Sequence, residues 1–281
     1  MTRISRWHLA ARLAVACSGL ALAALAVHRF AATPALATPP VTPVLANVVA
    51  AEGAYGKIKG RLVWGGSTAP TPKPLDVNKD TNVCGKGGAL LDRKLVVDSK
   101  TNGVKWGLAY IVNPKGTNPG AVEALLKKEP KVQLDQKYCE YVPYVVGMNE
   151  GQSLLLKSSD AVNHNVHLNA FTNEAFNVIL PPNGEMTKKL VAERRPMSMT
   201  CDIHPWMQSY IMVYNHPFFA VTDADGSFEI DGVPAGPQKL VLWQPAVGYV
   251  TPGAGSGQAV TVVAGKTVDA GEIKLDPAKV K

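Results

Sequence analysis

The sequence has no block of basic residues of the kind that binds nucleic acids, and no repeat of the kind that builds a solenoid. The 281 residues carry a formal net charge of +7, but residues 1–37 contain four arginines and no acid, so removing that segment leaves +3. The remaining Lys and Arg are scattered, which gives no case for nucleic-acid binding. Because 46% of the residues are hydrophobic and only 18% are charged, the composition also excludes a disordered chain.

Histidine is also scarce. The sequence contains six, and those outside residues 1–37 are His164, His167, His204 and His216. A multicopper oxidase needs an additional copper cluster with many histidines, so this class is excluded and we expect no enzymatic activity.

The first 37 residues are typical of an export signal. Arg3 and Arg6 give a positive start, Leu13 to Val27 carry no charge, and Ala35 to Ala37 offer small residues for cleavage. This apolar stretch is shorter than the roughly 20 residues that a membrane-spanning helix needs, which favours cleavage over a retained anchor. We therefore expect a periplasmic or otherwise exported protein, which contacts a membrane only through this segment if it is not cleaved. Residues 38–52, rich in Ala, Pro, Thr and Val, form a linker.

Short alternations of apolar and polar residues, bounded by Gly, Pro, Asn or Asp, predict an all-β protein. Only residues 120–128 favour a helix. Ala220 to Thr222 and Ser227 to Ile230 predict a hairpin with Asp-Gly in its turn. The regular spacing is typical of β-sandwiches, with further strands expected over 56–64, 94–97, 104–112, 152–157, 162–168, 186–191, 197–201, 210–214, 239–243, 258–263 and 269–275, and two within 131–147.

The strongest chemical signal is the segment Cys201-Asp-Ile-His204-Pro-Trp-Met207. A tight loop leaving a strand can direct its thiol, imidazole and thioether to one point. Type 1 copper is bound by two histidines and one cysteine in a trigonal plane, with a weak axial methionine. The second histidine can come from the segment His164-Asn-Val-His167, and only one of these two should join, because they point to opposite faces of a strand.

Other interpretations of this segment are weaker. Zinc usually takes four strong donors, and methionine is a poor one. A nucleophilic Cys–His pair needs a group that orients the base, and none is evident. A buried cysteine near a histidine can also arise by chance. The position of Met207 and the upstream His164-Asn-Val favour a metal site.

Three cysteines lie outside the signal segment, namely Cys84, Cys139 and Cys201. Cysteines of exported proteins tend to pair, and three cannot all pair within one chain. Assigning Cys201 to the metal leaves Cys84 and Cys139 for a disulfide. The alternative is two separate buried thiols.

The stretch from Val132 to Tyr214 resembles the small cupredoxins amicyanin, pseudoazurin and plastocyanin, and its Cys-x-x-His-x-x-Met loop is most similar to amicyanin. The resemblance implies a cupredoxin Greek-key β-sandwich that binds one type 1 copper. Asn163 stands where the family commonly has proline, and residues 194–196 replace a glycine-containing turn. The implied roles are buried first ligand for His164, thiolate for Cys201, second imidazole for His204 and axial donor for Met207.

The end of the chain has a second resemblance. Thr222 to Ile230, Val233 to Gly236 and Lys239 to Trp243 resemble the carboxypeptidase regulatory-like, transthyretin-like β-sandwich, which has no catalytic machinery. Gly56 to Trp64 resembles its first strand. Two layouts remain open. Either residues 131–215 are a cupredoxin domain inserted into one discontinuous sandwich made of 53–130 and 216–281, or 53–215 are an enlarged cupredoxin followed by a tail domain, 216–281.

We therefore expect an exported electron-transfer protein. His204 should be partly exposed, and Pro205, Trp206 and Met207 should form an apolar patch, so that a redox partner docks near His204 and Trp206. The alternatives are a copper-binding or delivery protein without a redox partner, and a metal-free envelope or adhesion module.

Overall fold

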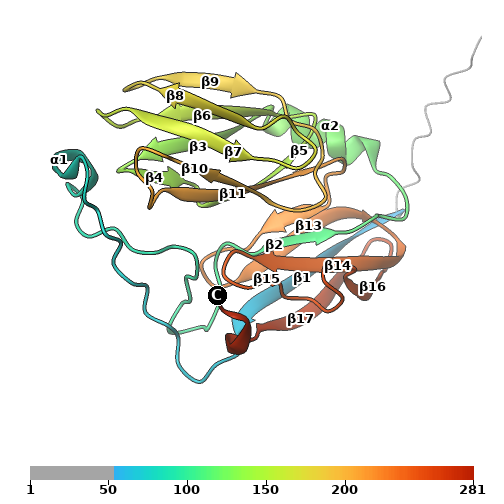
Figure 1. The fold of residues 1–281 in the computed structure, drawn as a ribbon. Coiled ribbons are helices and arrows are strands. Elements are labelled where there is room, and N and C mark those ends of the chain that lie inside the picture. The colour runs from blue at the N-terminus through green and yellow to red at the C-terminus, as the bar shows by residue number, and fades with distance from the viewer. Residues whose placement is uncertain (1–53) are drawn as a thin grey trace, which may run out of the picture. The chain divides into compact units, whose positions relative to one another are not determined.

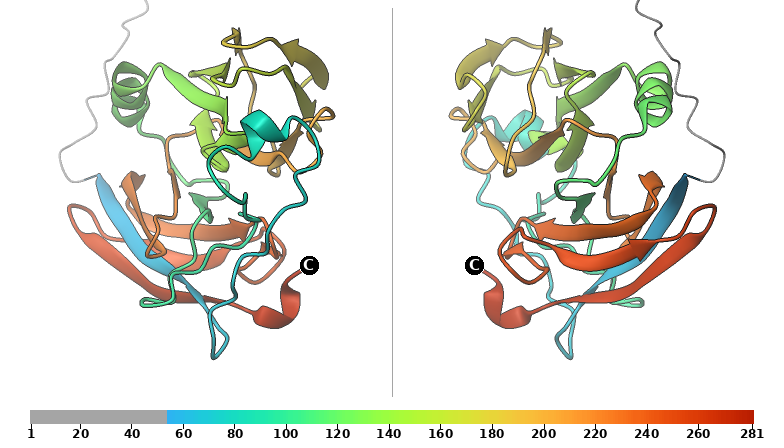
Figure 2. Two further views of the ribbon diagram at one scale, coloured as in Figure 1. Left: turned by 90° about the vertical axis from the view of Figure 1, so that its left-hand side faces the viewer. Right: turned by 90° about the vertical axis from the view of Figure 1, so that its right-hand side faces the viewer.

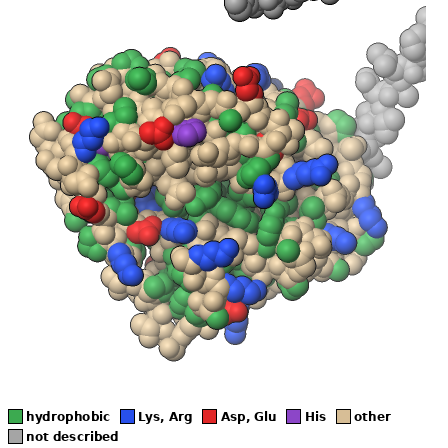
Figure 3. Space-filling view, viewed as in Figure 1, with side chains coloured by type: hydrophobic (Ala, Val, Ile, Leu, Met, Phe, Trp, Pro, Cys, Tyr) green, Lys and Arg blue, Asp and Glu red, His purple; other side chains and the backbone are tan. Residues whose placement is uncertain are grey.

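The computed structural model describes residues 54–281, so the predicted signal segment and the predicted linker both lie outside the described residues. The regular secondary structure of the described part is almost all β-strand, arranged in four sheets, which confirms the all-β class (Figure 1). None of its helices is long and apolar enough to cross a membrane. Acidic and basic side chains are both distributed over the face shown in Figure 3.

Nine strands from Lys131 to Tyr214 form what we call the central sandwich. One of its sheets has the strand order β5-β11-β10-β7-β8 and the other β4-β3-β6-β9. The strands are β3 (Lys131–Lys137), β4 (Glu140–Val142), β5 (Val145–Asn149), β6 (Ser153–Ser158), β7 (His164–Asn169), β8 (Phe176–Leu180), β9 (Glu185–Lys188), β10 (Met197–Thr200) and β11 (Gln208–Tyr214).

Alternation along the strands builds the core of the central sandwich. In β6 every second residue is buried, and Leu154 and Leu156 pack with Leu168 of the facing sheet. Each such side chain contributes about 1.5–3 kcal/mol on burial. Met197 and Met199 of β10 belong to the same buried cluster and are packing residues. The core thus lies between the two sheets and ends next to β7 and β10.

The remaining strands form what we call the flanking sandwich. Strand β1, from before the central sandwich, pairs antiparallel with β13 and parallel with β17, both from after it. The second sheet has the order β12-β2-β14-β15, with β16 also paired to β14. The strands of the flanking sandwich are β1 (Tyr55–Trp64), β2 (Leu108–Ile111), β12 (Phe219–Val221), β13 (Ser227–Pro234), β14 (Gly236–Gln244), β15 (Gly248–Tyr249), β16 (Gln258–Val262) and β17 (Thr267–Leu275). Strands from before and after the central sandwich therefore share one sheet.

Three local predictions are corrected. The turn between β12 and β13 forms, with the Asp223 N–H donating to Ser227, but the strands enter different sheets and do not form a hairpin. The Thr222 hydroxyl bonds to Val104 and accepts the Gly107 N–H, which holds β12 against β2. The strand expected over 104–112 is only β2, because Trp106 has a φ of 69° and interrupts it, and 94–97 makes only one isolated bridge.

A cluster rich in aromatic residues joins the two sandwiches. The ring centroids of Tyr214 and Phe219 lie 4.5 Å apart in a stack, and those of Tyr210 and Trp243 lie 5.2 Å apart edge to face. Aromatic pairs of this kind are worth about 0.5–1.5 kcal/mol beyond the area they bury.

The connection from β1 to β2 makes a long excursion to the central sandwich (Figure 2). We call its outer part, residues 73–92, the strap. Its two legs are bonded to each other, since Leu75 N–H donates to Leu90 and Asp92 N–H donates to Lys73, both at 2.8 Å. Its tip is the short helix α1 (Thr81–Cys84). The helix predicted over 120–128 is α2 (Pro119–Lys128), between β2 and β3, and a short 3₁₀ turn, Pro277–Lys279, follows β17.

A disulfide fixes the strap to the central sandwich. Cys84 of α1 bonds to Cys139, in the turn between β3 and β4, with an S–S distance of 2.04 Å, which confirms the predicted pairing. Leu75, Val77 and Val83 also pack against the central core. The strap therefore rests on the end of the sandwich where β7 and β10 meet the turn before β4.

Candidate metal centre

The four predicted ligands come from two neighbouring strands and the loop after them. His164 begins β7, and Cys201 follows β10, which is hydrogen-bonded to β7 in the same sheet. His204 and Met207 lie on the loop between β10 and β11. This loop is closed by backbone hydrogen bonds from Cys201 N–H to Met207 and from Met207 N–H to His204. All four side chains are buried, with at most 1% of each residue exposed.

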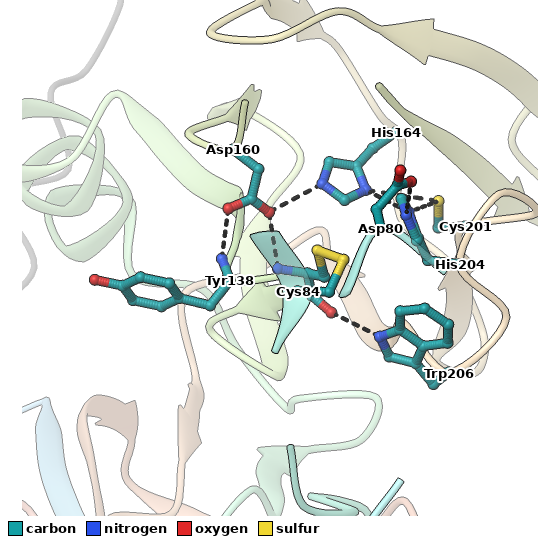
Figure 4. The surroundings of a disulfide bond; sticks show 9 residues. Asp80, Cys84, Tyr138, Asp160, His164, Cys201, His204 and Trp206 are labelled. Atoms are coloured by element: carbon teal, nitrogen blue, oxygen red, sulfur yellow. Dashed lines mark hydrogen bonds and ion pairs between the residues drawn. A yellow bond between two sulfur atoms is a disulfide. The ribbon is translucent and has the colours of Figure 1, made fainter. Parts of the chain in front are cut away.

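Three donor atoms converge in this site (Figure 4). The Cys201 Sγ lies 3.9 Å from His164 Nδ1 and 3.8 Å from His204 Nδ1. A metal about 2.0–2.1 Å from nitrogen and about 2.3 Å from sulfur, with donors 120° apart, sets each sulfur–nitrogen distance at about 3.8 Å. The sulfur–nitrogen distances therefore fit one shared metal ion. The two Nδ1 atoms lie 2.9 Å apart, which is a hydrogen-bond length and is shorter than the distance of about 3.6 Å that the same metal geometry gives.

The outer nitrogen of each imidazole faces a carboxylate. His164 Nε2 lies 2.9 Å from Asp160 Oδ2, and His204 Nε2 lies 2.9 Å from Asp80 Oδ2. A carboxylate accepts the N–H on Nε2 and leaves Nδ1 as the ligand atom. Two nitrogen lone pairs directed at each other and at a sulfur repel unless a proton or a metal cation lies between them. The arrangement therefore fits a position occupied by either a shared proton or a metal cation.

The carboxylate of Asp160 is built into the central sandwich. It accepts backbone N–H groups of Tyr138 at 2.7 Å and Cys139 at 2.8 Å in addition to the His164 ring. Although burial raises the pKa of Asp160, these hydrogen bonds lower it below the usual value. Asp160 therefore presents a charged carboxylate to His164.

The pKa values of the two histidines are shifted in opposite directions. Burial lowers the pKa of His164, but hydrogen bonds to Asp160 and Cys201 outweigh it and raise the pKa to about 9. The pKa of His204 lies below its usual value because burial outweighs the hydrogen bond to Asp80. A metal that binds both Nδ1 atoms would displace the additional proton of His164.

Asn165, on β7 next to His164, is hydrogen-bonded to the loop that carries Cys201 and His204. Its backbone N–H points to the Cys201 sulfur at 3.5 Å, and its side-chain oxygen accepts the Asp202 N–H at 2.7 Å and the Ile203 N–H at 3.3 Å. Burial raises the pKa of the Cys201 thiol, but hydrogen bonds from His164 and from backbone N–H groups outweigh it and lower the pKa. The thiol is thereby biased toward the thiolate, the form that binds metals.

Two expectations about exposure were wrong. His204 was expected to be partly exposed, but it is fully buried because the strap lies over it and Asp80 bonds to its ring. Met207 was expected in a surface patch, but it is buried in the central core, while Pro205 is exposed and Trp206 is half-buried. His167 lies on the other face of β7 from His164, as predicted, and its Nδ1 faces Asp202 at 3.1 Å.

Sequence reasoning missed Asp80, Asp160 and Asn165. Asn165 and Asp160 lie one and four residues from His164, so the neighbourhood of the ligand could have suggested them. Asp80 lies 124 residues from His204 in sequence. The only signal for it was the predicted disulfide, because Cys84 is one helical turn after Asp80.

No protein-family model matches the chain, and no curated protein matches it. Solved structures similar to part of it include the Cu-containing nitrite reductase of Thermus scotoductus SA-01, at 18% identity over 30% of this chain and 22% of that one, with a TM-score of 0.28. The purple cupredoxin of Nitrosopumilus maritimus matches at 18% identity over 30% of this chain and 99% of its own, with a TM-score of 0.26. The Cu(I) form of an amicyanin mutant matches at 17% identity over 38% of this chain and 98% of its own, with a TM-score of 0.28. The chain thus spans about a fifth of the nitrite reductase, and matches at this level carry no argument about function.

Proposed function

We propose that this chain is an exported type 1 copper protein that transfers electrons through one mononuclear copper site. His164, Cys201 and His204 would hold the copper, and Met207 would be the weak axial donor. The observation that carries the proposal is the convergence of two Nδ1 atoms and one sulfur within 4 Å of one another in a buried site.

The chemistry of the donors supports copper over other metals. Two imidazoles and one thiolate with a thioether on the same loop are the donors of blue-copper centres. A structural zinc site takes four strong donors from the protein, and the fourth residue of this set is a methionine. Copper bound here would supply a one-electron redox couple.

The surroundings of the donors support electron transfer over catalysis. Cys201 and both histidines are buried, so a substrate has no direct approach to a metal between them. The hydrogen bonds of Asn165 and the closed loop hold the donors in place. A site that moves little between oxidation states exchanges electrons readily.

The partner surface near His204 and Trp206 remains a proposal. Because His204 is buried, the accessible part of this region is a surface cavity of about 240 Å³, lined by Trp206 and Met207 of the loop and by Leu75 and Leu91 of the strap. Leu91 is 43% exposed. The cavity is also lined by Asp92, Arg93, Lys94 and Glu140, so a small redox partner would dock on a rim that combines apolar and charged side chains.

A second function is favoured by the burial of His204. A copper-binding or delivery protein without a redox partner has no need of an exposed ligand edge, and its metal would be held under the strap. A reversible reduction potential together with fast electron exchange with a small redox protein supports the first function. Slow exchange with all such partners, with copper retained, supports the second.

The site itself is tested by titrating the purified protein with Cu(II). We expect one copper per chain and an intense thiolate-to-copper charge-transfer band, which Cys201→Ser abolishes. His164→Gln should abolish the band, while the matched control His167→Gln, on the opposite face of the same strand, should leave it unchanged. A wild type that binds Cu(II) but stays colourless would overturn the type 1 copper proposal, and a folded wild type that binds no copper would leave a metal-free envelope module as the alternative.

A further inference from the structure

The contact between Asp80 and His204 joins two parts of the molecule that the chain keeps far apart. Asp80 lies on the strap, outside the central sandwich, and its Oδ2 is 2.9 Å from the Nε2 of a fully buried histidine. About a third of the Asp80 side chain is exposed, at 35%. The carboxylate therefore closes the site at the boundary between the buried ring and the solvent.

Asp80 does not make the bond that its position in the strap favours. It immediately precedes α1, where an aspartate side chain normally accepts a backbone N–H of the first helical turn. No such bond forms, and the side chain turns to His204 instead. Asp80 also has a φ of 49°, in the left-handed region that non-glycine residues seldom adopt. Helix α1 therefore lacks a side-chain cap, because the side chain of Asp80 bonds to His204 instead.

The strap is held in place by contacts that do not involve Asp80. The disulfide from Cys84 fixes its tip, the two legs are bonded to each other, and Leu90 is buried in the central core. Arg93, just beyond the strap, donates to the Tyr141 carbonyl. These contacts hold the Asp80 backbone over the loop, so its side chain needs little further ordering to reach His204.

We propose that Asp80 is a positioning residue for His204, and that the strap is a cover through which metal exchange at this centre is controlled. By accepting the Nε2–H, Asp80 holds the ring with Nδ1 directed at Cys201 and His164. By covering the ring, the strap keeps chelators and competing ligands from this edge of the site. The inference rests on the proposed metal site but does not require an electron-transfer partner.

The consequence for the metal can be estimated. Removing a carboxylate that orients a metal-binding histidine typically costs about 10–100-fold in metal affinity. Asp80→Ala removes both the acceptor and the charge, whereas Asp80→Asn keeps an oxygen that can accept the Nε2–H. We therefore expect faster loss of metal in both variants, with the larger effect in Asp80→Ala.

The test uses the full chain with Asp80→Ala, Asp80→Asn and the control Asp76→Asn. Asp76 is an exposed carboxylate on the same strap and makes no hydrogen bond to either histidine. Side-chain ¹H–¹⁵N NMR of histidine, without added metal, should show His204 as a slowly exchanging Nε2–H tautomer in the wild type and in Asp76→Asn. This signal should exchange rapidly or change tautomer in Asp80→Ala. After the bound copper has been reduced to Cu(I), a bidentate Cu(I) chelator should remove it from Asp80→Ala about 10–100-fold faster than from the wild type.

The two proposals fail in different ways. If Asp80→Ala keeps the His204 signal and loses copper at the wild-type rate, Asp80 has no positioning role, whatever the colour of the protein. If the wild type binds no copper but its His204 Nε2–H is protected only when Asp80 is present, the positioning role stands and the copper function is wrong. Should Asp80→Ala fail to fold, Asp80→Asn, which keeps the shape of the side chain, repeats the chelator test, and copper loss at the wild-type rate in that variant would overturn the positioning role.

Discussion

The two histidines of the candidate metal centre bond to the same kind of group, but different parts of the molecule supply it. Asp160, the partner of His164, lies four residues away in sequence and is fixed by two backbone N–H groups of the central sandwich. Asp80, the partner of His204, arrives on a disulfide-bonded strap from the connection between two strands of the flanking sandwich. One half of the site is thus encoded locally, and the other depends on contact between two sandwiches.

We expect the largest effect when the two sandwiches are expressed as separate fragments. We propose that 53–130 and 216–281 form one discontinuous domain, because β1 pairs with β13 and β17. Residues 131–215 expressed alone, with Cys139→Ser, should fold and bind copper, since they contain all four proposed ligands and Asp160. Residues 216–281 alone should show no cooperative thermal transition. A cooperative transition in that fragment would favour the sequential layout instead.

Removing the disulfide should have the next largest effect. In the chain-entropy model a crosslink over 55 residues stabilises by about 4 kcal/mol. The double variant Cys84→Ser, Cys139→Ser should lose up to this free energy of unfolding in urea, and its copper should become as accessible to a chelator as in Asp80→Ala. Asp80→Ala, which keeps the disulfide, is the control for access without loss of the crosslink. If neither the free energy of unfolding nor the rate of copper removal by the chelator changes, the strap is held in place by its other contacts.

The anchored carboxylate should matter more to folding than the one on the strap. Asp160→Ala leaves the buried N–H group of Cys139 and the part-buried N–H group of Tyr138 without their acceptor, and a fully buried group without a partner costs about 1–3 kcal/mol. We therefore expect a loss of about 2–4 kcal/mol in urea unfolding with a chelator present. Asp80→Ala should lose less than about 1 kcal/mol, since Asp80 is partly exposed and accepts only from His204. If Asp160→Ala and Asp80→Ala lost the same free energy of unfolding, the two carboxylates would not differ in how they are anchored.

Glu193 is a carboxylate that accepts backbone N–H groups, as Asp160 does, but it bonds to none of the proposed ligands. It therefore serves as a control for the structural role of such a carboxylate without a role in metal binding. Glu193 Oε1 accepts backbone N–H groups of Phe171, Thr172 and Asn173. Burial raises the pKa of Glu193, but these hydrogen bonds outweigh it and lower the pKa to about 2. Its contribution, at most about 3 kcal/mol, is present above the usual glutamate pKa and is lost as the pH falls from about 4.5 toward 2.

Glu193→Gln should therefore reduce the dependence of unfolding free energy on pH in this acidic range. It should leave the copper absorption band and the chelator rate unchanged. An altered band would mean that the loop before β10 also positions the metal, and an unchanged pH dependence would contradict the low pKa.

The central sandwich follows closely from the sequence because its strands alternate regularly and its ligands are close in sequence. Cys201, His204 and Met207 lie on one loop, and the opposite faces of His164 and His167 follow from the period of a strand. The disulfide followed from assigning Cys201 to the metal, which leaves Cys84 and Cys139 to pair. The ligand loop depends on residue type and short spacing, and the disulfide depends on the number of cysteines, so one sequence displays both directly.

The strap could not be predicted, because its contacts depend on the tertiary fold. No local pattern indicates that Asp80 leaves its helix uncapped to reach a residue 124 positions later, so the burial of His204 was missed. The prediction of a hairpin between β12 and β13 was wrong for a similar reason. Asp-Gly specified the turn, but bonds of Thr222 to the chain around Val104 decided which sheet β12 joins.

The most direct test of the account is anomalous diffraction at the copper edge from crystals of the Cu(II)-loaded full chain. We predict a single strong peak among His164 Nδ1, His204 Nδ1 and Cys201 Sγ, with Asp80 still bonded to His204 Nε2. A peak at any other position, or no peak in a protein that is folded and saturated with Cu(II), would contradict the proposed centre.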